Sequence, residues 1–288
     1  MTTLKVGVVL PSLAAQLRDG LDLRIAAQHA EAAGFDSIWH GDHLATGQSS
    51  LDLAVGLATV AAATERVSVG ASVFVPAIRP LVWAAKQVAS VQHVSGGRLI
   101  LGIGSGGGPA QWAAAEVSYA ERGARTDRAL DLLPALLAGD PVTVGDQEVV
   151  LAPAVTRPPF WVGNSAPIAI RRAARAGDGW FPSLITANAV AVGAARLAEL
   201  TEAALEIAVG TAGALGAGLL SRKEIAARLG ASHGTQLNDV PITGTPDEAA
   251  ARMIEFHDAG ATHLVMGFAD GDWRSQCDLL AEAVRLMR

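Results

Sequence analysis

The chain has 288 residues, of which half are hydrophobic and 17% are charged, so it can bury a sizeable core and is not a disordered protein. The net charge of −6 comes without a long run of either sign, which argues against nucleic-acid and anionic-membrane partners and favours small molecules. The single cysteine, Cys277, excludes an intrachain disulfide and a thiolate metal cage and fits a reducing cytoplasm.

The beginning of the sequence, Met1 to Leu10, runs directly into a strand pattern and lacks the basic start and apolar core of a signal peptide. The Ala-rich stretches further on are interrupted by charged residues or glycine before about 18 apolar residues accumulate. We therefore expect a cytoplasmic protein without a membrane span.

Short β-branched or apolar runs alternate with helical patterns rich in Ala, Leu, Arg and Glu, which is the order typical of parallel βα units. The predicted strands are Lys5–Leu10, Ser37–Trp39, Val67–Val75, Arg98–Ile103, Phe160–Val162, Gly179–Phe181, Leu205–Val209 and His263–Gly267. Because eight such units close a barrel, the sequence predicts an α/β fold, a (β/α)8 TIM barrel, in one domain over residues 1–288.

Two insertions are expected in this barrel, after the fourth and the seventh strand. Two short β patterns around Gly145-Asp146 predict a hairpin inserted in a βα connection. After the seventh strand, Ser221-Arg222-Lys223-Glu224 is a capping box that predicts an additional helix. A second box, Thr245-Pro246-Asp247-Glu248, starts a helix that should reach Ala259.

The second strand ends in Trp39-His40-Gly41-Asp42-His43, a dense polar cluster at the strand end where this fold places active sites. In one interpretation these residues only cap backbone groups of a turn. In the other, His43 donates or accepts a proton and Asp42 accepts a hydrogen bond from a cofactor or fixes the imidazole tautomer. A zinc site is a weaker third possibility, because the other strand ends offer no further ligands to complete a metallohydrolase centre.

Glycine follows two other strands. Gly102, Gly104 and Gly107 fit a dinucleotide-binding pattern, but they follow the fourth strand and no acidic residue closes the next one. We interpret Gly104 and Ser105 as a loop that lets a planar ligand or its phosphate approach the backbone, with a flexible lid as the alternative. Gly163-Asn164 precedes a helix whose first amides can bind an anion.

Taken together, these segments resemble the luciferase-like monooxygenase family, and in particular its actinobacterial branch of coenzyme F420-dependent (deazaflavin) oxidoreductases. The resemblance covers nearly the whole chain and rests on the order and spacing of several motifs. They include Val6-Gly7-Val8-Val9-Leu10-Pro11, Ala30 to Trp39 followed by Asp42-His43, Ser95 to Gly106, Glu121-Arg122-Gly123, Ala173 to Trp180 and Gly244-Thr245-Pro246.

The resemblance implies an isoalloxazine-type ring across the C-terminal mouth of the barrel, in a homodimer. Asp42-His43 is similar to the pair found in F420 users, whereas FMN monooxygenases more often have Glu there. A cis peptide bond at Ser72-Val73 is expected behind the ring. The resemblance also places Gly104, Ser105 and the Gly163-Asn164 turn against the ribityl-phosphate region of the cofactor.

Two departures from the family pattern narrow the expected substrate. Sugar-phosphate dehydrogenases of the branch carry an acidic residue in the glycine loop and a tryptophan soon after Asp-His, where this chain has Gly106-Gly107-Gly108 and Leu44-Ala45-Thr46-Gly47. The phosphate turn, often Gly-Gly, is Gly163-Asn164, so an amide side chain adds to or obstructs the anion contacts.

We therefore expect hydride transfer between coenzyme F420 and a small, apolar organic substrate, since the candidate lid loops at 184–192 and 216–240 are apolar. The alternatives are a reduced-FMN-dependent monooxygenase and a non-enzymatic flavin-binding protein.

Overall fold

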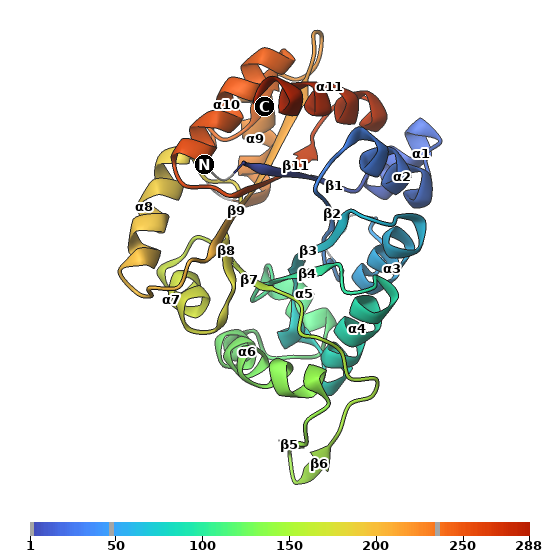
Figure 1. Cartoon of the computed structure of the whole chain (residues 1–288), viewed down its shortest axis with the longest axis vertical. Helices are drawn as coiled ribbons and strands as arrows, with labels where there is room; N and C mark the ends of the chain where they lie inside the picture. Colours follow the sequence, from blue (N-terminus) through green and yellow to red (C-terminus); the bar gives the residue numbers. More distant parts are fainter. Residues whose placement is uncertain (1–2, 46–48, 234–236) are drawn as a thin grey trace.

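The computed structural model describes residues 3–45, 49–233 and 237–288. Its centre is a closed barrel of parallel strands with helices around the outside (Figure 1). The barrel strands pair in chain order, and β9 closes the ring by pairing with both β8 and β11. They are β1 (Lys5–Val9), β2 (Ser37–His40), β3 (Ser68–Phe74), β4 (Leu99–Ile103), β7 (Phe160–Gly163), β8 (Gly179–Phe181), β9 (Glu206–Leu215) and β11 (His263–Phe268).

The predicted TIM-barrel fold is confirmed, and each of the eight predicted strands is present. The largest difference is in β9, which continues to Leu215 because its second half pairs with an additional strand, β10 (Ile242–Gly244). The sequence carries no separate sign of β10, which has only three residues and pairs with β9 alone.

The outer layer consists of one helix after each barrel strand, and these helices bury their apolar faces against the outer surface of the sheet. They are α2 (Leu23–Ala33), α3 (Leu53–Ala63), α4 (Leu81–Val94), α6 (Arg122–Ala138), α7 (Pro167–Ala176), α8 (Ala187–Ala198), α10 (Pro246–Asp258) and α11 (Trp273–Leu286). At the start of α10, the Thr245 side chain accepts from the Glu248 N–H while the Glu248 carboxylate accepts from the Thr245 N–H, as the capping box predicts.

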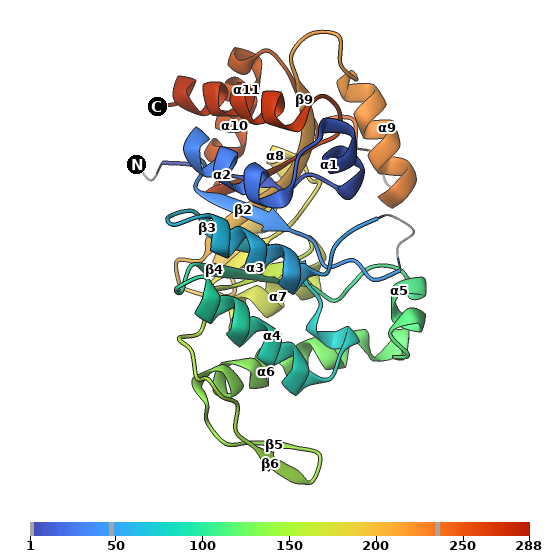
Figure 2. The same ribbon diagram turned by 90° about the vertical axis from the view of Figure 1, so that its right-hand side faces the viewer.

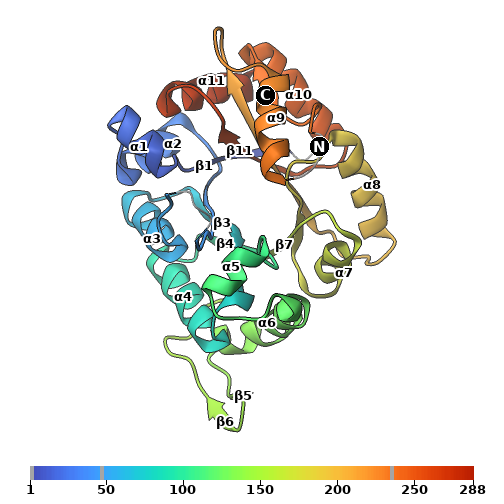
Figure 3. The ribbon, with the colours of Figure 1, turned by 180° about the vertical axis from the view of Figure 1, so that it is seen from behind.

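Short extra elements lie at the C-terminal ends of the strands, where the chain leaves the barrel. They are α1 (Leu13–Asp19), the 3-10 turns η1 (Pro76–Ile78) and η2 (Tyr119–Glu121), α5 (Pro109–Ala114) and α9 (Arg222–His233). Figure 2 shows α1, α5 and α9 gathered at one end of the barrel, with the chain termini at the other end. Seen from behind, α5 and α9 border the barrel mouth on different sides (Figure 3).

The predicted hairpin is formed by β5 (Val142–Val144) and β6 (Gln147–Val149), but its position requires a correction. It lies in an αβ connection, not a βα connection, because α6 occupies Arg122–Ala138 and ends at Gly139 before the hairpin begins. The hairpin therefore projects sideways from the barrel, away from the mouth (Figure 1).

Candidate active site

Asp42 connects the end of β2 to the turn after β3. Its carboxylate is buried and accepts from the Val75 N–H at 2.9 Å and from both terminal nitrogens of Arg79 at 2.7 and 2.9 Å. These partners lie more than 30 residues away and fix the strand end. Among the described side chains, Asp42 makes no hydrogen bond with His43, so the predicted orientation of the imidazole by Asp42 is not made by that contact.

His43 lies at the barrel mouth with an exposed imidazole. The ring folds back over Gly41, since a β-carbon built at Gly41 would come within 2.5 Å of His43 Nε2. The neighbouring His40 lies on the other face of β2, against Gly56 of α3, with its Nε2 3.2 Å from the Leu51 carbonyl oxygen. Burial lowers the pKa of His40. Of the two imidazoles in the motif, His43 is therefore the one available to a ligand.

The third strand contains the expected cis bond between Ser72 and Val73, beside an irregular register between β3 and β4. The Val73 side chain packs beside the aromatic cluster inside the barrel. Three glycines from neighbouring strands surround it, because a β-carbon at Gly102, Gly104 or Gly163 would lie 3.1, 2.4 or 3.0 Å from its methyl groups. Val73 thus fills the space that these glycines leave at the top of the barrel.

The glycine loop after β4 continues upward from this position. The Gly104 N–H donates to the Phe74 carbonyl at 2.9 Å, and Ser105 is partly exposed. Gly106 has a φ of +77°, and the indole nitrogen of Trp112 lies 2.9 Å from where its β-carbon would be. Trp112 is fully buried, and its N–H has no hydrogen-bond partner among the described residues. Sequence reasoning missed Trp112, which lies within α5, after the glycine motif.

The turn after β7 places Asn164 in the left-handed region with a φ of +90°. Its Oδ1 accepts from the Ala166 N–H at 2.8 Å, and its carbonyl accepts from the Trp180 indole at 2.9 Å. Ala166 is the residue that caps α7, so the amide side chain already takes one of the donors at this helix start. Gly163 lies below it, buried and without a side chain to obstruct the mouth.

Below these residues, the barrel is filled by aromatic rings. Trp39 and Trp161 stack with ring centres 5.4 Å apart, and the Trp39 indole donates to Ser37 Oγ at 2.7 Å. His263 Nε2 lies 2.7 Å from the same Ser37 oxygen, and burial lowers the pKa of His263 to about 3. The sequence alternation in β2 and β11 was the only available signal for this network.

A cleft of about 270 Å³ opens on the opposite side of the mouth, between the chain segments that leave β1 and β11. It is lined by Val9, Leu10, Pro11, Ser12, Ala15, Arg18 and residues 267–271 and 273. The candidate lid loops contribute little to it. Leu184 packs with Ala226 and Val240 instead. Two parts of the predicted segments lie outside the described residues: Thr46 and Gly47, from the stretch where the sugar-phosphate dehydrogenases carry a tryptophan, and residues 234–236 of the second lid loop.

No cluster of three or more His, Cys, Asp or Glu side chains capable of holding a metal occurs in the described ranges, so nothing there adds to the zinc hypothesis. Within the same ranges, no helix is both long and apolar enough to cross a membrane.

Comparison with known proteins agrees with this geometry. The model of the luciferase-like monooxygenase family matches residues 8–217. The chain belongs to this family, one of F420-dependent and flavin-dependent oxidoreductases. It is 37% identical over 166 residues to an F420-dependent glucose-6-phosphate dehydrogenase of Beutenbergia cavernae, covering 52% of this chain and 49% of the relative.

An uncharacterised protein of Mycobacterium tuberculosis is 31% identical over 180 residues, covering 54% of this chain and 62% of the relative. The chain thus spans about half to three fifths of the length of these two relatives. An F420-dependent secondary alcohol dehydrogenase, solved with an F420-acetone adduct, superimposes with a TM-score of 0.82 over 99% of both chains at 17% identity. This last similarity establishes the fold.

Proposed function

We propose that the chain is an F420-dependent oxidoreductase that exchanges a hydride between the cofactor and a small organic substrate at the barrel mouth. The observation that carries the proposal is the position of His43, whose imidazole lies over Gly41 at the strand end. An exposed imidazole there can donate or accept the proton that accompanies hydride transfer. Asp42-His43 also resembles the pair found in F420 users, which favours F420 over FMN.

The residues of the mouth fit a flat, tricyclic cofactor. Gly104 and Gly163 have no side chain that would compete with Val73 for space, so Val73 can form the surface against which a ring would lie. Val73 would support one face of the ring, and Ser72 would lie beside it. Ser105 and Asn164 would contact the ribityl-phosphate region with their polar side chains. When bound, F420 supplies a carbon that gives or takes a hydride.

Within this proposal, Asp42 acts through the backbone. Its bonds to Val75 and Arg79 hold the end of β2 against the turn after β3, and thereby keep His43 and Val73 in a fixed relation. The imidazole of His43 holds the proton at a solvent-exposed nitrogen, while the buried His40 on the outer face takes no part. In this proposal, Asp42 positions the strand end and His43 transfers the proton.

The alternative is an FMN-dependent monooxygenase, since homologues with this fold use either F420 or FMN. The two are distinguished by offering F420 and FMN in competition, with native mass spectrometry and absorbance as readouts. We expect one F420 per subunit at micromolar affinity or tighter. Tight binding of FMN with no binding of F420 would reverse the cofactor assignment, and binding without turnover of any substrate would favour a flavin-binding protein.

A further inference from the structure

The cleft between the segments after β1 and β11 opens onto the same mouth that would hold the cofactor. Its floor includes Val9 and Gly267, which lie next to each other at the upper end of the barrel. Val9 packs against the inner aromatic cluster, as Val73 does. A ligand in the cleft would therefore stand beside any ring supported by Val73. At about 270 Å³, the volume is near the lower limit for ligand pockets and suits a small molecule.

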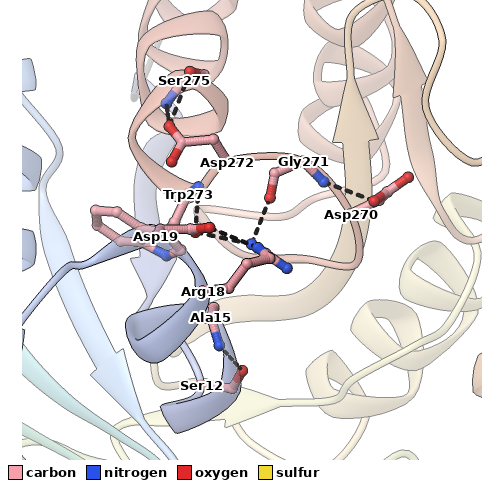
Figure 4. A network of polar contacts seen from close by, with 9 residues as sticks. All are labelled: Ser12, Ala15, Arg18, Asp19, Asp270, Gly271, Asp272, Trp273 and Ser275. Carbon is pink, nitrogen blue, oxygen red and sulfur yellow. Dashed lines mark hydrogen bonds and ion pairs between the residues drawn. The ribbon is translucent and has the colours of Figure 1, made fainter.

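One wall of the cleft carries the guanidinium of Arg18, which is held by hydrogen bonds through two of its three nitrogens (Figure 4). Arg18 Nε and Nη2 donate to the two oxygens of Asp19 at 2.6 and 2.8 Å, and Nη2 also donates to the Gly271 carbonyl at 2.9 Å. The Asp19 side chain is 7% exposed, whereas that of Arg18 is 57% exposed. The two N–H groups of Nη1 have no partner among the described residues, so they remain available to a ligand.

The charge around this guanidinium is negative overall. The hydrogen bond to Asp19 is the largest cause that raises the pKa of Arg18, and the charges of Asp272 and Asp270 act in the same direction. Glu224 lies near Asp270 as well, and Arg228 adds a positive charge near both of them. The carboxylates would repel an anion, whereas an uncharged oxygen could accept a hydrogen bond from Arg18 Nη1 without this repulsion.

The rest of the lining is mixed: Val9, Leu10, Pro11 and Phe268 offer hydrocarbon surface, while Ser12, Asp270 and backbone groups add polar surface. The Trp273 indole does not add a donor, because its N–H is taken by the Val9 carbonyl at 3.1 Å. The cleft therefore combines hydrocarbon patches with polar groups, among them the two donors of Arg18 Nη1.

We propose that this cleft is the substrate pocket and that it selects a small, uncharged molecule bearing a carbonyl or hydroxyl oxygen, which accepts from Arg18 Nη1. Phosphorylated and carboxylated substrates should bind more weakly, because the surrounding carboxylates repel them. The proposal rests on the proposed function, which it deepens by naming the class of substrate and the residue that recognises it.

The test compares two probes of similar size, cyclohexanone and cyclohexanecarboxylate, by ligand-observed NMR titration on the protein with and without F420. We expect cyclohexanone to bind at least about tenfold more tightly than the carboxylate. Arg18→Met, which keeps the aliphatic stem, should weaken cyclohexanone binding by roughly tenfold, the usual effect of losing hydrogen bonds from a charged donor. Asp270→Asn should strengthen binding of the carboxylate.

The matched control is Arg24→Met, which removes an exposed guanidinium paired with Asp22 at the start of α2, outside the cleft. Equal or tighter binding of the carboxylate by the wild type would overturn the proposal, and so would equal effects of Arg18→Met and Arg24→Met. If Arg18→Met fails to fold, two other measurements still test the proposal: the preference of the wild type for cyclohexanone over the carboxylate, and the effect of Asp270→Asn on binding of the carboxylate. Absorbance of the same samples reports whether F420 binds, which tests the cofactor assignment. The titration without F420 tests the substrate pocket by itself, so the two proposals can fail independently.

Discussion

The two halves of the barrel interior are built from the same strands but filled in opposite ways. The lower half contains the stacked indoles of Trp39 and Trp161 and the bonded pair Ser37 and His263. In the upper half, small aliphatic side chains take the place of the rings: Val9 and Val73 lie among Gly102, Gly104, Gly163 and Gly267. Under the proposed function, stability and ligand binding occupy separate levels of one barrel, so substitutions in the two levels should have separable effects.

The largest expected effect is on stability, from the lower level. Trp39 is fully buried, so Trp39→Ala should lower the free energy of unfolding by about 3–5 kcal/mol through lost burial and the cavity left behind. Chemical denaturation measures it. Trp83→Ala is the control, because that side chain is 63% exposed and its loss should change stability by roughly 0.5 kcal/mol or less. Similar losses for both variants would contradict the assigned role of the lower level.

The upper level should show the reverse pattern at His43. His43→Asn should retain cofactor binding and lower single-turnover hydride transfer by roughly 10²-fold, the usual range for loss of a general acid or base. His40→Asn is the matched control on the outer face of β2, where we expect a lower melting temperature and transfer within about threefold of wild type. Near-normal transfer by a folded, cofactor-loaded His43→Asn protein would remove His43 from the mechanism.

A smaller effect is expected on cofactor affinity at the boundary between the two levels. Gly104→Val would bring its β-carbon to 2.4 Å from Val73 Cγ2, so Val73 or the strand must shift and the ring loses its support. We expect the affinity for F420 to fall by more than about tenfold. Gly108→Val provides the comparison, because a β-carbon there meets no atom within 4 Å. Unchanged affinity in Gly104→Val would place the ring elsewhere.

The last expected effect concerns the pH dependence of stability and the polar part of the lower level. The pKa of His263 is lowered from 6.5 to about 3 by burial, so between these values the unfolded chain binds one proton more than the native chain. The stabilisation is present above pH 6.5 and is lost as the pH falls, by up to about 1.4 kcal/mol per pH unit. Unfolding free energies of wild type and His263→Gln between pH 7 and 4 should therefore converge. His93→Gln, exposed on α4, should keep the wild-type slope.

The barrel could be predicted because its signals are local. Alternating runs locate the strands, and the boxes at Ser221 and Thr245 locate helix starts within a few residues of chain. The position of the cis bond at Ser72-Val73 was also predicted, but from the family resemblance. Strand β10 was missed because its pairing with β9 depends on chain closure and leaves no periodic pattern in three residues.

The site was predictable only as a set of strand ends. His43 and the glycines follow from the rule that ligands bind at the C-terminal ends of barrel strands. The contacts of Asp42 with Arg79 and of Arg18 with Gly271 join residues 37 and 253 positions apart, which no local pattern reveals. The cleft likewise unites the first and last barrel strands and exists only after the ring of strands has closed.

The stacked pair in the lower barrel has an optical consequence. The ring centres of the two indoles are 5.4 Å apart and their planes differ by 27°, although their strands are three positions apart in the sheet. Indoles this close couple their electronic transitions, and such coupling gives a paired positive and negative band in circular dichroism. Trp39 lies on β2 and Trp161 on β7, so the bands exist only while the wall of strands between them is intact. The chain thus carries its own spectroscopic report of barrel closure, without any added label.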